Sequence, residues 1–233
     1  MPPVEVLSYR LSHRGKPVGS QTIKTADLGR HAQLEGRTQF QGPLGTHTVV
    51  QRSRCHARGV SLRFREETQE RNDTRRFDVT FDPRQGLVTA VKGPKDNASV
   101  PYLLPYRDPL SLLHEIRQLG AIEGPVRVPL LGKEVTVQLA GEVDLDTALG
   151  PRRARAYVLH PGQSVVYVDV EAPHAILKLT QRLPDGLVEA LLVKVATEAA
   201  LEPFGEPEEG RGKSRSGGKR RGQRRRPRRR KRT

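Results

Sequence analysis

The stretch that decides the fold is residues 77–82, which read Phe-Asp-Val-Thr-Phe-Asp. Apolar and polar residues alternate in it, so in an extended strand Phe77, Val79 and Phe81 share one face and the polar side chains share the other. This pattern is typical of an antiparallel strand with one buried and one solvated face. The turn residues Pro-Arg-Gln-Gly follow at 83–86, and a second extended run begins at 87, so the segment predicts a hairpin.

Outward from this hairpin, short alternating runs broken by turn residues extend from Val4 to about Val91. The same pattern returns in the second half of the chain. There it predicts strands at 126–130, 135–143, 154–159, 165–170, 175–183 and 187–195. Residues 160–163 and 184–186 contain Pro and Gly, and they predict hairpin-type turns whose glycines have positive φ.

One helix is predicted between the two halves, at 108–120. Asp108 is a good N-cap because its carboxylate can accept hydrogen bonds from the free amides of the first turn, and Pro109 suits the first helical position. Gly120 can take the left-handed conformation that ends a helix. The apolar stripe consists of Leu112, Leu113, Ile116 and Leu119. We therefore expect the helix to pack against the strands.

These elements predict a mainly β fold: a large curved antiparallel sheet or open barrel, with one helix covering its concave or open side. The β-rich globular domain is expected to comprise residues 1–201. An acidic linker rich in Pro and Gly follows at 202–210, and a disordered Arg-rich tail at 211–233. The tail has too little apolar surface to offset the entropy of ordering.

Charge is divided unevenly between the domain and the tail. The whole chain has a formal net charge of +15, but 14 of its 41 lysines and arginines lie in residues 211–233, which contain no acidic residue. The remaining 27 bases face 26 acids, so the first 210 residues are nearly neutral. The positive charge is therefore a property of the tail and not of a basic face on the domain.

A flexible polycation of this kind predicts polyanion binding, since guanidinium groups bind phosphates and release condensed counterions. The residues expected to make these contacts are Lys219, Arg220, Arg221, Arg224, Arg225, Arg226, Arg228, Arg229, Arg230, Lys231 and Arg232. Binding should be independent of nucleic-acid sequence, because nothing holds the side chains rigidly at a groove. DNA, RNA and anionic surfaces stay open as partners, as does a tail that serves solubility alone. The acids Glu202, Glu206, Glu208 and Glu209 could fold back and screen part of the tail.

Three segments resemble a known family. They are residues 9–19 (Tyr-Arg-Leu-Ser-His-Arg-Gly-Lys-Pro-Val-Gly), 75–82 (Arg-Arg-Phe-Asp-Val-Thr-Phe-Asp) and 106–113 (Tyr-Arg-Asp-Pro-Leu-Ser-Leu-Leu). Their order and spacing are similar to those of the uncharacterised bacterial family catalogued as domain of unknown function 3108, over about residues 4–195. The resemblance implies a β-rich fold with a helix near the middle, mostly in exported envelope proteins, and no established reaction. The Arg-rich tail departs from the family pattern.

Motifs for catalysis and metal binding are weak throughout. Residues 207–214 resemble a phosphate-binding loop, but Pro207 replaces the first Gly, and neither a strand nor a helix flanks the segment. The acids Glu142, Asp144 and Asp146 alternate along a strand end, and we interpret them as a solvated face in preference to a cation site or an acid/base pair. Asp169, Glu171 and His174 form a second acidic cluster, for which a catalytic site and a wet strand edge are about equally strong interpretations.

Cysteine and histidine add no site. Cys55 is the sole cysteine, so no intrachain disulfide can form, and its neighbour His56 would point to the opposite face of a strand. The seven histidines show no zinc-ligand spacing, and His114 is expected to be a packing histidine on the helix. We therefore expect no cofactor, no metal and no enzymatic activity.

The function that follows is that of a non-enzymatic binding protein, with a tail that contacts nucleic acid or another polyanion. The alternative is an envelope-associated protein that holds an apolar or lipid-like ligand in its curved sheet. The N-terminus lacks a basic, then apolar, leader, and no segment approaches the about 20 apolar residues that span a bilayer. A cytoplasmic location is expected for the sequence as written, or the cell envelope if the true start lies upstream.

Overall fold

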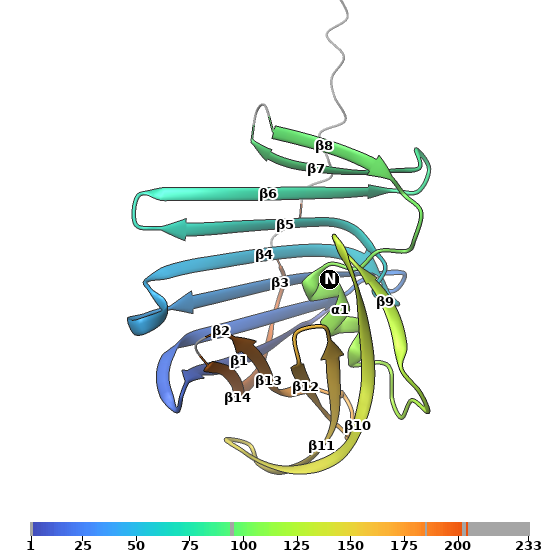
Figure 1. Cartoon of the computed structure of the whole chain (residues 1–233). Helices are drawn as coiled ribbons and strands as arrows, with labels where there is room; N and C mark the ends of the chain where they lie inside the picture. Colours follow the sequence, from blue (N-terminus) through green and yellow to red (C-terminus); the bar gives the residue numbers. More distant parts are fainter. Residues whose placement is uncertain (1, 94–95, 185, 202–203, 205–233) are drawn as a thin grey trace, which may run out of the picture.

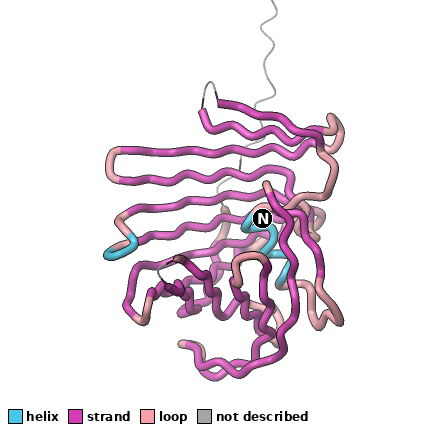
Figure 2. Tube along the Cα trace, viewed as in Figure 1, coloured by secondary structure: helices cyan, strands magenta, loops and turns pink. Residues whose placement is uncertain are grey.

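The computed structural model describes residues 2–93, 96–184, 186–201 and 204. Within these residues the chain forms fourteen strands, one α-helix and one short 3-10 helix (Figure 1, Figure 2). All fourteen strands belong to one antiparallel sheet that does not close into a barrel. The predicted fold class, a curved β-rich sheet with a covering helix, is confirmed.

The bounds of the elements follow the turn signals in the sequence. The strands are β1 Val4–His13, β2 Lys16–Asp27, β3 His31–Phe40, β4 His47–His56, β5 Ser61–Glu70, β6 Asp73–Asp82, β7 Leu87–Gly93, β8 Asp96–Pro101, β9 Val126–Leu130, β10 Lys133–Thr147, β11 Gly150–His160, β12 Ser164–Asp169, β13 Ile176–Leu183 and β14 Gly186–Glu198. The 3-10 helix η1 is Gly42–Leu44, and the α-helix α1 is Pro109–Ile116. The deciding stretch forms most of β6, and Val79 and Phe81 are buried in it as predicted.

The order of strands shows two meanders joined at the chain ends. Strands β1 to β8 lie side by side in sequence order, strands β9 to β14 do the same, and β1 pairs with β14. The free edges are therefore β8 and β9, which residues 102–125 connect (Figure 1). Pairing of β1 with β14 makes the sheet continuous, because it places the N-terminal and C-terminal strands at its centre.

The segment before α1 bridges the two meanders at one end of the strands. The Tyr106 carbonyl accepts a hydrogen bond of 2.9 Å from the amide of Ser61 at the start of β5. The Arg107 amide donates to the Pro129 carbonyl of β9 at 2.8 Å, and the Leu131 amide donates back to the Arg107 carbonyl at 2.9 Å. These contacts bring β5 and β9 near each other although they are far apart in the sheet order.

Helix α1 is shorter than the predicted span of 108–120. It begins as expected, with Asp108 as N-cap and Pro109 in the first turn, but it ends at Ile116. Beyond that residue, the Leu119 amide bonds to the Ile116 carbonyl, three residues back, so the last turn tightens and the α-helix does not continue. Gly120 does take a positive φ of 61°, four residues after the helix end.

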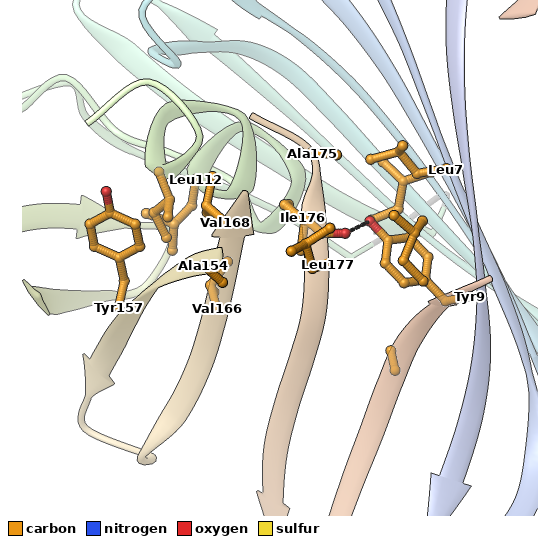
Figure 3. Close-up of a cluster of buried hydrophobic side chains, with 14 of the residues drawn as sticks. Leu7, Tyr9, Leu112, Ala154, Tyr157, Val166, Val168, Ala175, Ile176 and Leu177 are labelled. Carbon is orange, nitrogen blue, oxygen red and sulfur yellow. Dashed lines mark hydrogen bonds between the residues drawn. The ribbon is translucent and has the colours of Figure 1, made fainter. Parts of the chain in front are cut away.

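The main core fills the space between α1 and the strands around β1 and β14 (Figure 3). Tyr9 is 1% exposed, and its hydroxyl donates a 3.0 Å hydrogen bond to the Ile176 carbonyl. Burial raises the pKa of this phenol, so Tyr9 stays protonated and keeps that donor. The helix contributes Leu112 and Ile116 to the same cluster. The expectation that α1 packs on the sheet is confirmed.

Candidate functional site

A cavity of about 470 Å³ lies on the inner face of the sheet, the face that contacts α1. Its wall is mostly apolar, and its apolar residues include Leu11, Phe40, Leu112, Leu113, Val166 and Leu179. The polar lining residues come from several strands and are Gln21, Thr38, Gln51, Lys133, Ser164, Thr180 and Gln181. The cavity is therefore a mostly apolar hollow that also carries hydrogen-bonding groups.

The cavity has a buried floor and an exposed mouth. Leu112 of α1 is only 4% exposed, so the helix forms the floor. Lys133, Pro161 and Gln181 also line the cavity, but they are exposed and lie in or beside strand ends. The mouth is therefore at the hairpin ends, where Lys133 places an ammonium group beside an apolar interior.

A buried carboxylate fixes the helix that forms this floor. Asp108 is 0% exposed and accepts hydrogen bonds from the hydroxyls of Ser53 at 2.7 Å and Ser61 at 2.6 Å. It also accepts from the amides of Leu110 and Ser111, each at 3.0 Å. Burial raises the pKa of Asp108, while its hydrogen bonds act in the opposite direction. The network links β4, β5 and α1, so it sets the position of the floor.

The turn between β4 and β5 approaches α1 closely, and a glycine makes this possible. Gly59 has φ of +86°, and a Cβ at this position would lie 2.8 Å from the Glu115 Cβ and 3.0 Å from the Ser111 carbonyl oxygen. Only a residue without a side chain fits at that distance and that φ without displacing the helix.

The Arg117 side chain holds the C-terminal end of α1. Its guanidinium group pairs bidentately with Glu5, at 2.5 Å and 2.9 Å, and donates to the carbonyls of Pro173 and His174. With Asp108 at one end and Arg117 at the other, the helix is anchored to β1, β4, β5 and the turn after β12.

Cys55 and His56 do not form a nucleophile and base. Cys55 is 0% exposed, and burial raises the pKa of its thiol to about 12, so the thiolate is not formed near neutral pH. His56 is exposed on the opposite face of β4, where its ring stacks on that of His31. The prediction that the two side chains point to opposite faces is confirmed.

The acids on β10 form a solvated face, as interpreted from the sequence. Glu142, Asp144 and Asp146 are all exposed. Arg153 donates to Glu142 at 2.7 Å and Arg155 lies 3.3 Å from it, and the hydrogen bond from Arg153 lowers the pKa of Glu142. Glu142 is therefore paired with arginines of β11, and Asp144 lies 3.9 Å from Arg153.

The second acidic cluster differs from the predicted wet strand edge at one residue. Asp169 is 7% exposed, because β12 ends there in a turn whose Glu171 amide donates to its carboxylate at 3.0 Å. Glu171 instead points to Arg152, at 2.9 Å, and the His174 ring contacts the Asp169 backbone carbonyl. The three side chains do not converge on a shared site.

His114 is partly buried against the β4–β5 turn. Its Nε2 lies 3.2 Å from the Ala57 carbonyl oxygen, and burial lowers the pKa of its imidazole. The expected packing role is confirmed. Among the described residues, no group of three or more His, Cys, Asp or Glu is arranged to hold a metal ion.

Several sequence predictions lie outside the described residues: the phosphate-loop-like segment 207–214, the linker acids and all eleven residues expected to bind polyanions. No helix within the described part of the chain is long and apolar enough to cross a membrane.

The sequence identified Asp108 as a cap, but it did not identify Ser53 and Ser61 as its partners. They look like ordinary strand residues until the sheet places them beside the helix.

Comparison with known proteins adds a family and a fold. A family model described as "Protein of unknown function (DUF3108)" matches residues 8–193. Among solved structures, the chain is similar to a β-barrel-like protein of domain of unknown function DUF1849 from Brucella abortus, with 11% identity and a TM-score of 0.54 over 85% of this chain and 99% of that one. That likeness concerns the fold alone. No curated protein matches the chain.

Proposed function

We propose that this chain, which belongs to the DUF3108 family of proteins of unknown function, is a non-enzymatic binding protein whose curved sheet holds an apolar or lipid-like ligand. The observation that carries the proposal is the cavity of about 470 Å³ on the inner face. Pockets for small ligands have volumes of roughly 300–1,000 Å³, with apolar walls and few polar groups.

The arrangement of the cavity favours an amphipathic ligand. An apolar chain would contact the buried residues around Leu112 and Val166, where it exchanges water for close-packed side chains. A polar or anionic head group would remain at the mouth, near Lys133 and Gln181. The floor is held in place by the Asp108 network and by Arg117, so the cavity is preformed and binding requires little ordering of the protein.

The test is titration of the full chain with cis-parinaric acid, a fluorescent fatty acid. Ala190 is 5% exposed and lines the cavity, so Ala190→Phe adds a ring to that space. We expect this variant to bind the probe about tenfold more weakly or worse. Ala98→Phe, a matched substitution on the exposed strand β8, should bind like the original chain. Equal affinity in the two variants would exclude the cavity as the binding site.

A second function is favoured by a different observation, the concentration of 14 basic residues in positions 211–233. We propose that Lys219, Arg220 and the nine further basic residues up to Arg232 bind nucleic acid or another polyanion without sequence preference. Fourteen like charges in 23 residues repel one another, so a polyanion that neutralises them gains both contact and counterion release.

This second function is tested by measuring DNA and RNA binding across a salt series, for the full chain and for a chain that ends at Gly210. The full chain should bind both nucleic acids with a steep salt dependence. The shortened chain should bind them at least about tenfold more weakly. If the two chains bind equally, the tail is not the binding segment.

A further inference from the structure

The outer face of the sheet, opposite α1, carries a group of arginines on three adjacent strands. Cross-strand register places Arg52 opposite Arg65 and Arg54 opposite Arg63, all four pointing away from the buried inner residues such as Phe64. Arg76 on β6 lies beside them. We name these five residues the outer arginine patch: Arg52, Arg54, Arg63, Arg65 and Arg76.

Three carboxylates of the described strands lie close to four arginines of this patch, and one of them, Asp78, is 3.9 Å from Arg63. Glu35 pairs with Arg52 at 2.9 Å, and Asp78 accepts from both Arg65 and Arg76 at 2.6 Å. Glu67 lies 3.9 Å from Arg76 and is the third acid on this surface. Among the described residues, the patch therefore places five arginines beside three acids, and like charges directly opposite across strands are unfavourable. The surface therefore favours additional anionic groups.

A residue from the C-terminal segment already rests on the patch. Phe204 is 6% exposed, and its ring centre lies 5.0 Å from the Arg63 guanidinium carbon and 5.5 Å from that of Arg65. Guanidinium groups at this distance from an aromatic ring are attracted to its face. Phe204 is thus an aromatic anchor on two arginines of the outer face.

Leu201 lies on the same face of the sheet as Phe204. Leu201 packs against the small cluster of Val4, Val6 and Ala26 on the outer side of β1 and β2. The register across the sheet runs from Ala26 through Gln33 and Arg54 to Arg63. Leu201 therefore lies over β1 and β2, and Phe204 lies over β5, on the same face of the sheet.

The sequence next to this anchor is acidic. Glu202, Glu206, Glu208 and Glu209 lie within five residues of Phe204, and no basic residue lies between positions 202 and 210. Five extended residues span up to about 17 Å. Neighbouring strands are about 4.8 Å apart, so this length reaches across about three strands. Every arginine of the outer patch is within reach of these carboxylates.

We propose that the outer arginine patch is the docking surface for the acidic linker 202–210, with Phe204 as its anchor and the four glutamates as counterions for the arginines. The linker carboxylates then serve the domain and do not screen the Arg-rich tail, which leaves the molecule from its outer face, away from the cavity. This docking depends neither on a ligand in the cavity nor on what the tail binds.

The test uses the full chain with a nitroxide spin label at Gly210→Cys. Cys55 is buried with a raised thiol pKa, so the label reacts at the introduced cysteine. A docked linker brings the nitroxide near β5 and β6, so the amide NMR signals of Arg63, Arg65 and Arg76 should lose most of their intensity. Amides of Val165 and Val166 on β12, which line the cavity on the inner face, should keep theirs.

Two variants test the two parts of the docking. Phe204→Ala removes the anchor, and changing Glu202, Glu206, Glu208 and Glu209 to Gln removes the counterions. Each of these variants should restore the amide signals of the patch. The matched control is the double variant Asp144→Asn with Asp146→Asn, in which the patch signals should stay broadened. Unchanged broadening in both variants, or no broadening in the labelled full chain, would overturn the proposal. If patch signals respond only when duplex DNA is added, the face binds the polyanion itself and the linker is not its occupant.

Discussion

The two faces of strands β4 and β5 are stabilised in opposite ways. On the inner face, Ser53 and Phe64 lie opposite each other, one bonded to the buried Asp108 and the other packed in an apolar cluster. On the outer face, Arg52 and Arg65 lie opposite each other and are held by carboxylates. The difference teaches that one alternating sequence supports two independent surfaces, an inner one that depends on burial and an outer one that depends on charge.

The largest effect should come from a substitution that separates the two faces at adjacent residues. Phe64 is 2% exposed, so Phe64→Ala removes a buried ring and leaves a cavity, and it should lower the free energy of unfolding by about 3–5 kcal/mol. Arg65→Ala, the next residue on the outer face, should cost about 1 kcal/mol or less. Urea denaturation of both variants checks this. Similar losses of unfolding free energy in the two variants would show that the outer-face Arg65 stabilises the fold as much as the buried Phe64 ring does.

The Asp108 network should come next. Asp108→Ala leaves Ser53 and Ser61 without their acceptor and two first-turn amides uncapped, so it should lower the free energy of unfolding by about 3 kcal/mol. The same variant should weaken binding of cis-parinaric acid, since the floor of the cavity loses its anchor. Asp144→Ala, on the exposed face of β10, is the control. An equal loss of unfolding free energy in Asp108→Ala and Asp144→Ala would show that the Asp108 network does not hold the helix in place.

A smaller loss is expected at the turn that touches α1. Gly59→Ala forces a positive φ on an L-residue and places a Cβ 2.8 Å from that of Glu115, so it should cost about 2 kcal/mol. Gly15→Ala is a matched control, because it has a similar φ of +75° but open space around its Cα. Thermal unfolding of the two variants separates steric contact with the helix from backbone strain. Equal shifts in the two midpoints would show that backbone strain alone, and not the contact with Glu115, destabilises Gly59→Ala.

The buried carboxylate Asp108 and the exposed carboxylate Glu142 should also give pH dependences of opposite sign. Burial raises the pKa of Asp108 in the folded state, so its contribution is most favourable below the ordinary aspartate pKa and is lost as the pH rises through the folded value. Arg153 lowers the pKa of Glu142, so its contribution is present above the ordinary glutamate pKa and is lost as the pH falls. Stability curves of Asp108→Asn and Glu142→Gln, each compared with the original chain, should diverge in opposite directions. If the two variants differ from the original chain with the same dependence on pH, the pKa values of Asp108 and Glu142 are not shifted in opposite directions.

The smallest effect is expected at the exposed acids of β10. Glu142 and Arg153 form an exposed ion pair at 2.7 Å, and Glu142→Gln should leave the denaturation midpoint at neutral pH almost unchanged. Chemical denaturation at low and at high salt checks this, because any contribution should shrink further as salt screens the pair. A large shift of the midpoint would show that the β10 acids form a structural network.

Local features of the fold were predictable. The alternation in residues 77–82, the cap at Asp108 and the turn at 160–163 each depend on interactions within a few residues, and each was confirmed in the structure. The end of the helix was not predictable to the same degree. Gly120 marks a left-handed position, but contacts of Arg117 with Glu5 and with the turn after β12 accompany an earlier end.

The candidate site was predictable only in outline. A curved sheet covered by a helix suggested an apolar hollow, and the structure places one there. Its lining could not be listed in advance, because Leu11, Leu113 and Val166 meet only when the sheet curves around α1. The same holds for the contact of Phe204 with Arg63, which joins residues 141 positions apart.

The sequence by itself determined the class of fold, the near-neutral domain and the basic tail, since composition and short-range periodicity set these properties directly. The tertiary structure alone decided that β1 pairs with β14, that two strand serines bond to the helix cap, and which face holds the arginines near Phe204. The physical reason is range. Periodicity and capping are interactions between near neighbours, whereas a cavity and a docking surface arise from segments that only chain folding brings together.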